Sequence, residues 1–216
     1  MQLLGSETST ERIRVNLEAW LRCNTVKPLL AVALFTLVPC TETAHDRPAG
    51  AWLDAAPVQW NRPGATLPKP PKDAARNITP EYCKAHERPE NSNEERAVAG
   101  AGWIVFASFQ GGNGVTVVGG AVSEDGMCRP DPYQHFVLVR GRFAGTLSPR
   151  LMRARSDGSV NKVEFPASRR IEANFSHYTD ADPFCCPSRI SKATYELREQ
   201  SGKPLVVLIG VRTRST

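Results

Sequence analysis

The chain has 216 residues, of which 41% are hydrophobic and 7% aromatic, and its formal net charge at pH 7 is +5. This length supports one ordinary hydrophobic core with appendages and argues against a second independent domain. The positive charge is mild, and the sequence has neither a basic stripe interleaved with aromatic residues nor a known nucleic-acid-binding motif. We therefore expect no nucleic acid partner.

Residues 1–40 are predicted to be a signal or targeting segment. Basic residues between Arg12 and Lys27 precede an apolar run from Leu29 to Val38, which is the pattern of an export signal. The run is too short to span a bilayer as a mature helix. The alternative, two helices of a cytosolic protein, is less attractive because nothing downstream would pair with them. From the long polar stretch before Lys27 we expect the true start codon to lie further downstream.

The apolar run ends in a sequence that resembles a bacterial lipobox. Leu37 lies where that motif has leucine, and Cys40 is the candidate lipid anchor. Pro39 departs from the motif, because a small residue normally precedes the cysteine. Two alternatives stay open: a protein that is lipid-anchored to the membrane through Cys40, or one that is periplasmic or secreted.

Residues 41–92 are predicted to be a proline-rich tether and wrapping arm. Eight of the 17 prolines fall in this range, and they favour extended backbone over a central strand. Trp52 and Trp60 would be wasted on a plain linker. We therefore expect part of the arm to lie along the folded domain, held there by Cys83.

Residues 93–216 are predicted to be a β-rich domain that begins with one short helix. Residues 93–99 combine a capping residue, Asn93, with acidic residues in the first turn and good helix formers. Strands are predicted near residues 103–109, 115–118, 133–140, 142–147, 161–165, 169–178, 189–198 and 205–212. Short strands at regular spacing, without helices between them, predict a mainly β fold, an antiparallel meander that forms a single sheet or a sandwich.

Four cysteines lie outside the targeting segment: Cys83, Cys128, Cys185 and Cys186. Four cysteines allow three full pairings, and spacing alone does not choose between them. In an oxidising compartment we expect disulfides rather than reduced, buried thiols. We prefer Cys83 and Cys128 each bonded to one member of the doublet. Adjacent side chains of an extended segment point to opposite faces, and a bond between neighbours closes a small strained ring.

No catalytic, cofactor or metal site stands out in the sequence. The glycines at 111–114 precede a strand and lack the following Lys-Ser or Lys-Thr of a phosphate loop, so they indicate a hairpin turn. Cys128 and His135 are the nearest pair of nucleophile and base, but a disulfide at Cys128 would exclude that chemistry. The cysteine spacing does not suit zinc, and Asp180 and Asp182 lack a third carboxylate for calcium. We expect no catalytic residue, no cofactor and no metal.

A basic stretch extends from Arg140 to Arg170. This stretch contains eight basic residues and only two acidic ones. The basic residues are Arg140, Arg142, Arg150, Arg153, Arg155, Lys162, Arg169 and Arg170, and the acidic ones are Asp157 and Glu164. If several gather on one face, they would attract anionic lipid headgroups or an acidic wall polymer. The alternative is a set of solvated strand edges whose charges discourage aggregation.

Several segments together resemble one protein family: residues 60–65, 101–103, 125–130, 143–149 and 182–188. The combination, above all Asp-Gly-Met-Cys-Arg-Pro at 125–130 and Cys-Cys-Pro-Ser at 185–188, is similar to the LppP/LprE lipoprotein family, bacterial exported proteins of uncharacterised function. The resemblance covers roughly residues 60–214. It implies a location in the cell envelope and transfers no catalytic residues.

Two functional alternatives follow. The first is an uncharacterised, noncatalytic exported or lipid-anchored envelope protein whose disulfide-stapled β domain binds an envelope component or a partner protein. The second is an extracytoplasmic enzyme with a site built from His135 or His177 and a carboxylate on the sheet. Thiol redox chemistry at Cys185 and Cys186 is a third reading, but it lacks the Cys-x-x-Cys spacing of known exchangers.

Overall fold

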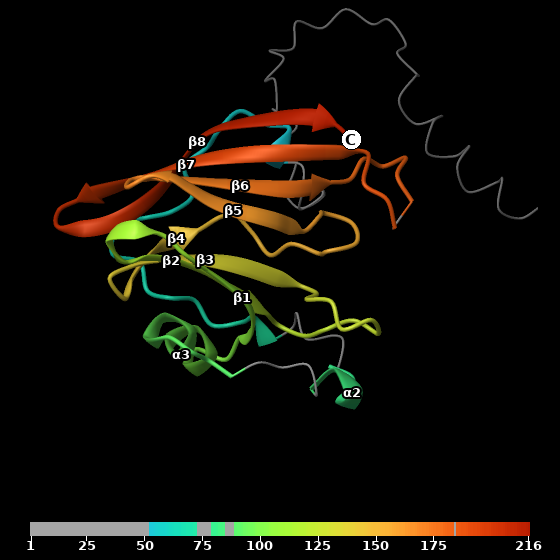
Figure 1. Ribbon diagram of the computed structural model, residues 1–216, viewed down its shortest axis with the longest axis horizontal. Coiled ribbons are helices and arrows are strands. Elements are labelled where there is room, and N and C mark those ends of the chain that lie inside the picture. The colour runs from blue at the N-terminus through green and yellow to red at the C-terminus, as the bar shows by residue number, and fades with distance from the viewer. Residues whose placement is uncertain (1–51, 73–78, 85–88, 184) are drawn as a thin grey trace, which may run out of the picture. The chain divides into compact units, whose positions relative to one another are not determined.

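The computed structural model describes residues 52–72, 79–84, 89–183 and 185–216 (Figure 1). All of them lie in one unit of the chain, Ala44–Thr216. The expected targeting segment and the candidate lipid anchor Cys40 fall outside the described residues. None of the helices within the described ranges is both long enough and apolar enough to cross a membrane.

The domain consists of two antiparallel sheets of four strands each, stacked in layers (Figure 1). The first sheet has the order β1 (Ile104–Gln110), β2 (Val115–Ala121), β3 (Tyr133–Val139) and β4 (Arg142–Thr146). The second has the order β5 (Val160–Ala167), β6 (Arg170–His177), β7 (Arg189–Gln200) and β8 (Lys203–Ser215). Each strand pairs with its neighbour in sequence. The predicted mainly β meander is therefore confirmed, in its sandwich form.

Burial along the strands follows the layers. In β6, buried side chains alternate with partly exposed ones, because only one face of the second sheet meets the core. In β2 every residue is buried, because the outer face of the first sheet is covered as well. Helix α3 (Asn93–Gly100) lies there (Figure 1), and its Val98 packs in one apolar cluster with Trp103 and Phe136.

The predicted helix is present, but its cap lies one residue earlier than Asn93. The Ser92 hydroxyl accepts a hydrogen bond from the Glu95 amide at 3.1 Å, and the Glu95 carboxylate accepts one from the Ser92 amide at 3.3 Å. This reciprocal pair is a capping box, which satisfies two backbone donors at the helix start. A shorter helix, α2 (Glu81–Lys84), was not predicted, and the turn predicted at 111–114 contains a 3-10 helix, η4 (Gly112–Gly114).

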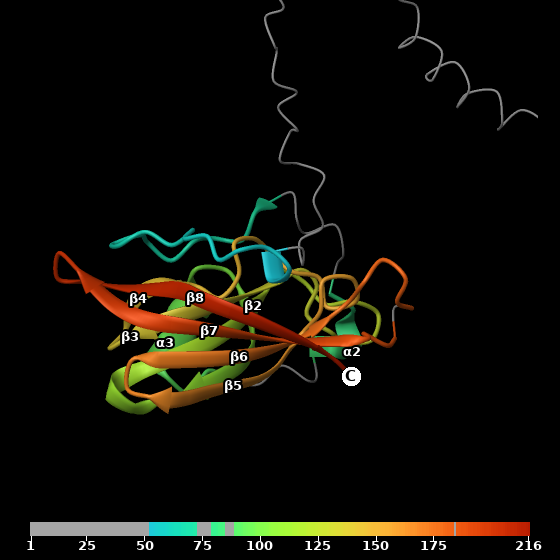
Figure 2. The same cartoon turned by 90° about the horizontal axis from the view of Figure 1, so that it is seen from above.

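The arm packs along the edge where β4 and β8 lie (Figure 2). Trp52 is buried, and its ring meets the rings of Trp60 and Phe175 with centroids 5.6 and 5.4 Å apart. Edge-on aromatic contacts of this kind favour packing beyond the area they bury. This contact with the core is the one that the two tryptophans of the arm led us to expect.

Asn61 joins the two sheets through its side-chain amide. The Nδ2 group donates to the carbonyl of Thr146 on β4 at 3.0 Å and to that of Val206 on β8 at 3.1 Å, while Oδ1 accepts from the Thr146 amide at 2.9 Å. Gly145 makes room for it, since a Cβ there would lie 2.3 Å from Asn61 Cγ. Two of the segments that carry the family resemblance, 60–65 and 143–149, thus meet at this contact.

Replacing Asn61 with Ala is expected to lower the free energy of unfolding by about 2–3 kcal/mol, because partly buried backbone groups on both edge strands lose their partner. Urea denaturation of the full chain measures the change. Asn161→Ala is the matched control, since its exposed hydrogen bond to Ser176 should contribute less than about 0.5 kcal/mol. Equal losses in the two variants would show that Asn61 does not join the sheets.

Candidate functional site

Four turns gather at one end of the sandwich, the left-hand end in Figure 1. They are η4, the β3–β4 turn at Arg140 and Gly141, the β5–β6 turn at Ser168 and Arg169, and the β7–β8 turn at Ser201 and Gly202. Strands of a meander alternate in direction, so every second connection falls at the same end. Residues that are far apart in the sequence therefore become neighbours there.

The β3–β4 turn places an arginine in a left-handed conformation. Val139 pairs with Arg142, which leaves two residues in the turn, and both have positive φ angles, 51° at Arg140 and 72° at Gly141. Such a turn matches the twist of the paired strands, and its first position favours Asn, Asp or Gly. Arginine is not among the residues that this backbone prefers.

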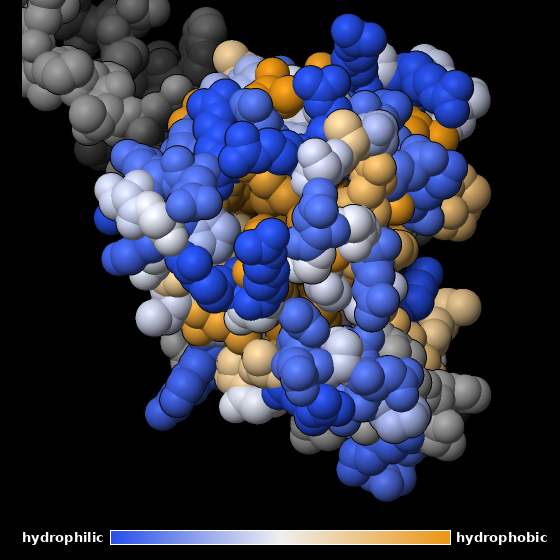
Figure 3. All heavy atoms as spheres, turned by 60° about the vertical axis from the view of Figure 1, so that its left-hand side comes forward, coloured by the Kyte–Doolittle hydropathy of each residue, from blue (hydrophilic) through white to orange (hydrophobic). Residues whose placement is uncertain are grey.

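A groove of about 300 Å³ opens between the sheets at this end. We call it the arginine groove; it is lined by Asn113, Val115, Val139, Arg140, Arg142, Ser168, Arg169, Leu197, Arg198, Glu199 and Pro204. The lining contains four arginines and a single carboxylate, together with apolar side chains. Figure 3 shows this face of the domain, with hydrophilic side chains crowded around smaller apolar patches.

The four arginines differ in whether their guanidinium groups already have partners within the protein. Arg198 forms an ion pair with Glu196 at 2.7 Å, and Arg142 donates to the carbonyl of Gly202. Within the described part of the chain, the side chains of Arg140 and Arg169 have neither an ion-pair partner nor a hydrogen-bond partner. Two exposed guanidinium groups at one groove are therefore available to an anion.

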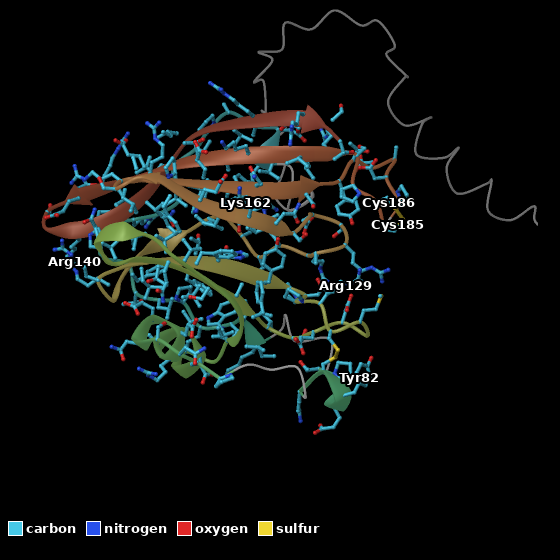
Figure 4. The ribbon with its side chains drawn as sticks, in the orientation of Figure 1. Tyr82, Arg129, Arg140, Lys162, Cys185 and Cys186 are labelled. Carbon is cyan, nitrogen blue, oxygen red and sulfur yellow. A yellow bond between two sulfur atoms is a disulfide. The ribbon has the colours of Figure 1, made fainter. Side chains whose placement is uncertain are left out.

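The structure brings together only part of the predicted basic stretch. Arg140, Arg142 and Arg169 meet at the groove, whereas Arg153 pairs with Asp131 at 3.2 Å and Lys162 pairs with Glu164 at 2.7 Å. Figure 4 shows Lys162 on β5, away from Arg140. Sequence reasoning missed Arg198, since nothing in the sequence shows that the end of β7 lies opposite the β3–β4 turn.

His135 lies in an aromatic environment within the core. Its ring centroid is 5.4 Å from that of Phe106, 6.3 Å from that of Phe109 and 5.5 Å from that of Tyr133. Burial disfavours the charged imidazolium and lowers the pKa of His135 to about 3. Its Nε2 atom is buried and has no hydrogen-bond partner among the described residues. This setting offers no path for a substrate.

His177 is the last residue of β6, and it connects the second sheet to Asp54 of the arm. Its Nδ1 lies 2.7 Å from the Ser191 hydroxyl, and its Nε2 lies 3.3 Å from Asp54 Oδ2 and 3.1 Å from Arg189 Nη2. Burial lowers the pKa of His177, and the Asp54 carboxylate partly opposes that shift. The order carboxylate, imidazole and hydroxyl is that of a hydrolase triad, but Ser191 is 0% exposed and also contacts Thr213 Oγ1 at 2.7 Å. A substrate cannot reach that hydroxyl in this conformation.

The preferred disulfide pairing is wrong. The structure bonds Cys83 to Cys128, with Cα atoms 5.2 Å apart, and Cys185 to Cys186. The doublet lies in a turn, where the Cys186 amide donates to the Pro183 carbonyl at 2.9 Å. The two neighbouring side chains therefore do not point to opposite faces as they would in an extended strand. Figure 4 shows Cys185 and Cys186 at the end opposite Arg140.

Aspartates organise the two loops that carry the most distinctive family motifs. Burial would raise the pKa of Asp125, but hydrogen bonds from the Arg129 and Met127 amides outweigh it and hold the pKa below its ordinary value. Figure 4 shows Arg129 at the same end as the cysteine doublet. Hydrogen bonds from the Ser188 and Thr179 amides lower the pKa of Asp182 to about 2.

The carboxylates of Asp125 and Asp182 therefore accept hydrogen bonds from backbone amides of the loops in which they lie. No group of three or more His, Cys, Asp and Glu side chains is placed to hold a metal ion in the part of the chain that is described.

The family match covers most of the residues that line the arginine groove. Residues 115–200, from β2 to β7, match the LppP/LprE lipoprotein family, while comparisons with curated proteins and with solved structures found no match. The matched segment contains all four groove arginines as well as Cys128, and it supports an extracytoplasmic, envelope-associated location. The resemblance carried by the sequence motifs is confirmed: residues 115–200 match the model of the LppP/LprE lipoprotein family.

Proposed function

We propose that this protein is a noncatalytic envelope protein whose disulfide-stapled β domain binds an anionic component of the envelope at the arginine groove. The observation that carries the proposal is the presence of Arg140 and Arg169, without side-chain partners in the described ranges, at one groove between the sheets. A cluster of one sign of charge in a concave site focuses its field and attracts ions of the opposite sign.

The groove is a better candidate than the other basic surface of the domain. On the outer face of the second sheet, Arg212 and Arg214 also lack side-chain partners within the described ranges, and Lys192 beside them is paired with Glu172. The two arginines there come from one strand, however, and the only apolar side chain in the lining of that hollow is Ile190. At the groove, arginines from different turns line one volume together with Val115, Val139, Leu197 and Pro204. Concave sites that combine apolar lining with a few convergent polar groups are the usual form of a ligand site.

We favour binding over the enzyme alternative because neither histidine that it requires lies at an accessible cleft. His135 is enclosed by aromatic rings, and the hydroxyl beside His177 is fully buried. Conversion of a substrate at either place would need the domain to open first. The groove is open to solvent without any such change, and its chemistry is that of anion binding.

We further propose the chain organisation expected from the sequence: a leader over residues 1–40, an arm over 41–92 and the β domain over 93–216. Trp52 is already buried against the domain. A lipid on Cys40 would therefore hold the domain within about 40 Å of the membrane, because an extended residue spans at most about 3.6 Å. Intact-mass analysis of protein isolated from its host tests this; a mature chain that retains residues 1–39 would contradict it.

Anion binding is tested with fluorescein-labelled polyphosphate and the full chain, by fluorescence anisotropy at about 10 mM and about 150 mM ionic strength. The double variant Arg140→Asn/Arg169→Gln is expected to bind about a hundredfold more weakly, because each charge-assisted hydrogen bond contributes about 1.5 kcal/mol or more. Arg212→Gln/Arg214→Gln removes the same charge from the outer face and is expected to bind like the parent. Equal losses in the two double variants would contradict the proposal.

A further inference from the structure

We propose that the arginine groove and the hollow next to it form one two-part site for a phosphate-bearing amphiphile. The phosphate would lie at Arg140 and Arg169, and the first apolar carbons would lie against Phe165 and Leu197. This inference rests on the proposed function and adds the chemical class of the ligand.

The neighbouring hollow supplies the apolar half of the site. It has a volume of about 240 Å³ and is lined by Gly112, Asn113, Val115, Phe165, Ala167, Ser168, Arg170 and Leu197. Val115 and Leu197 line both this hollow and the arginine groove, so the two spaces adjoin. One has four arginines around it, and the other has an aromatic ring and a single arginine. A ligand that fills both must be charged at one end and apolar at the other.

The charged half suits phosphate in particular. A guanidinium group presents its N–H donors as a planar fork that matches the oxygens of phosphate, and phosphate can accept from more than one such fork at once. Arg140 and Arg169 come from two different turns of the groove, so an anion between them can be held from two sides. A single phosphate therefore uses both of the guanidinium groups that have no partner within the described ranges.

The size of the site limits how much of a ligand it covers. The arginine groove has a volume of about 300 Å³. That volume holds a phosphate with its linking atoms, and the hollow holds a few carbons more. Whole acyl chains of a lipid would extend beyond it. The site thus fits the head and the first carbons of an amphiphile, and inorganic phosphate would leave the apolar half empty.

The backbone at Arg140 gives independent support. Its φ of 51° lies in the left-handed region, where Asn or Gly is preferred at this turn position. Arginine does not stabilise this turn, and its side chain has no partner in the described part of the protein. The presence of a cation at this position is therefore best explained by the binding of an anionic ligand. Arg140→Asn should remove the cation and leave the turn at least as stable as before.

The inference is tested by isothermal titration calorimetry on the full chain with three probes. These are inorganic phosphate, dihexanoylphosphatidic acid below its micelle concentration, and dihexanoylphosphatidylcholine, which has the same chains and no net charge. We expect dihexanoylphosphatidic acid to bind at least about tenfold more tightly than either of the others. Inorganic phosphate leaves the apolar half of the site empty, and the choline cation of dihexanoylphosphatidylcholine would lie close to the groove arginines and be repelled by them.

Variants separate the two halves. Arg140→Asn should weaken the binding of dihexanoylphosphatidic acid about tenfold without lowering the urea midpoint of unfolding, which excludes a merely structural role. Ala167→Asn places a polar group in the hollow at an exposed position. It should weaken the binding of the same lipid and leave inorganic phosphate unaffected.

The outcomes distinguish this inference from the proposed function. If dihexanoylphosphatidic acid binds no better than inorganic phosphate, or no better than dihexanoylphosphatidylcholine, the amphiphile site is wrong, while arginine-dependent binding of polyphosphate would still support an anion site. If Arg140→Asn changes the binding of none of the anionic probes, polyphosphate included, both proposals are wrong.

Discussion

Removing the Cys83–Cys128 disulfide is expected to lower the free energy of unfolding by about 4 kcal/mol. The bond joins residues 45 positions apart in the chain, and a crosslink that closes a loop of this length restricts the unfolded ensemble by about that amount. The variant to make is Cys83→Ala/Cys128→Ala, because alanine places no unpaired polar group at Cys83, which is fully buried. Urea denaturation of the oxidised full chain measures the change.

The second disulfide is the control, since it joins adjacent residues. A loop of that size restricts the unfolded chain very little, and Cys185→Ala/Cys186→Ala is expected to lower the free energy of unfolding by roughly 1 kcal/mol or less. The doublet is also exposed, so its removal leaves no cavity in the core. Similar losses in the two double variants would show that the long loop is not what makes the first bond stabilising.

Acidification below pH 6.5 is expected to destabilise the domain through His135. Its pKa in the folded protein is lowered from an ordinary value of 6.5 to about 3, so between these values the unfolded chain binds a proton that the folded chain does not. This contribution to stability is complete above pH 6.5 and is lost as the pH falls. The expected slope is about 1.4 kcal/mol per pH unit from this one group.

His135→Leu is expected to flatten that slope. The free energy of unfolding is measured in urea between about pH 5.3 and 6.5, which starts about one pH unit above the ordinary pKa of a glutamate. The variant should lose much less stability than the parent over this interval. At pH 7 it should be as stable as the parent or more so, because the substitution removes a buried nitrogen that has no partner among the described residues.

His177→Gln is the comparison for the acid response. Burial lowers the pKa of His177, and the Asp54 carboxylate partly offsets this shift. His177 should therefore contribute less than His135 to the dependence of the free energy of unfolding on pH. A slope that is unchanged in His135→Leu would show that this histidine is protonated without unfolding.

The amino-acid sequence by itself determined the fold class and the position of every strand. The segments rich in β-branched and aromatic residues between turn signals became strands, because such side chains favour extended backbone whichever strand they pair with. The Gly111–Gly114 turn and the Asn93–Gly100 helix were found for the same reason, since both depend on short-range backbone preferences. The short helix Glu81–Lys84 has no such pattern and was missed.

Only the tertiary structure decided which residues of different turns and loops meet. The pairing of Cys83 with Cys128, the contact of Asn61 with both sheet edges and the meeting of Arg140, Arg169 and Arg198 at one groove all depend on how two sheets stack and in which register. Those relations join residues that are far apart in the chain, and periodicity carries no information about them. The candidate site is therefore a property of the packed sandwich, even though each strand that builds it could be predicted from its own residues.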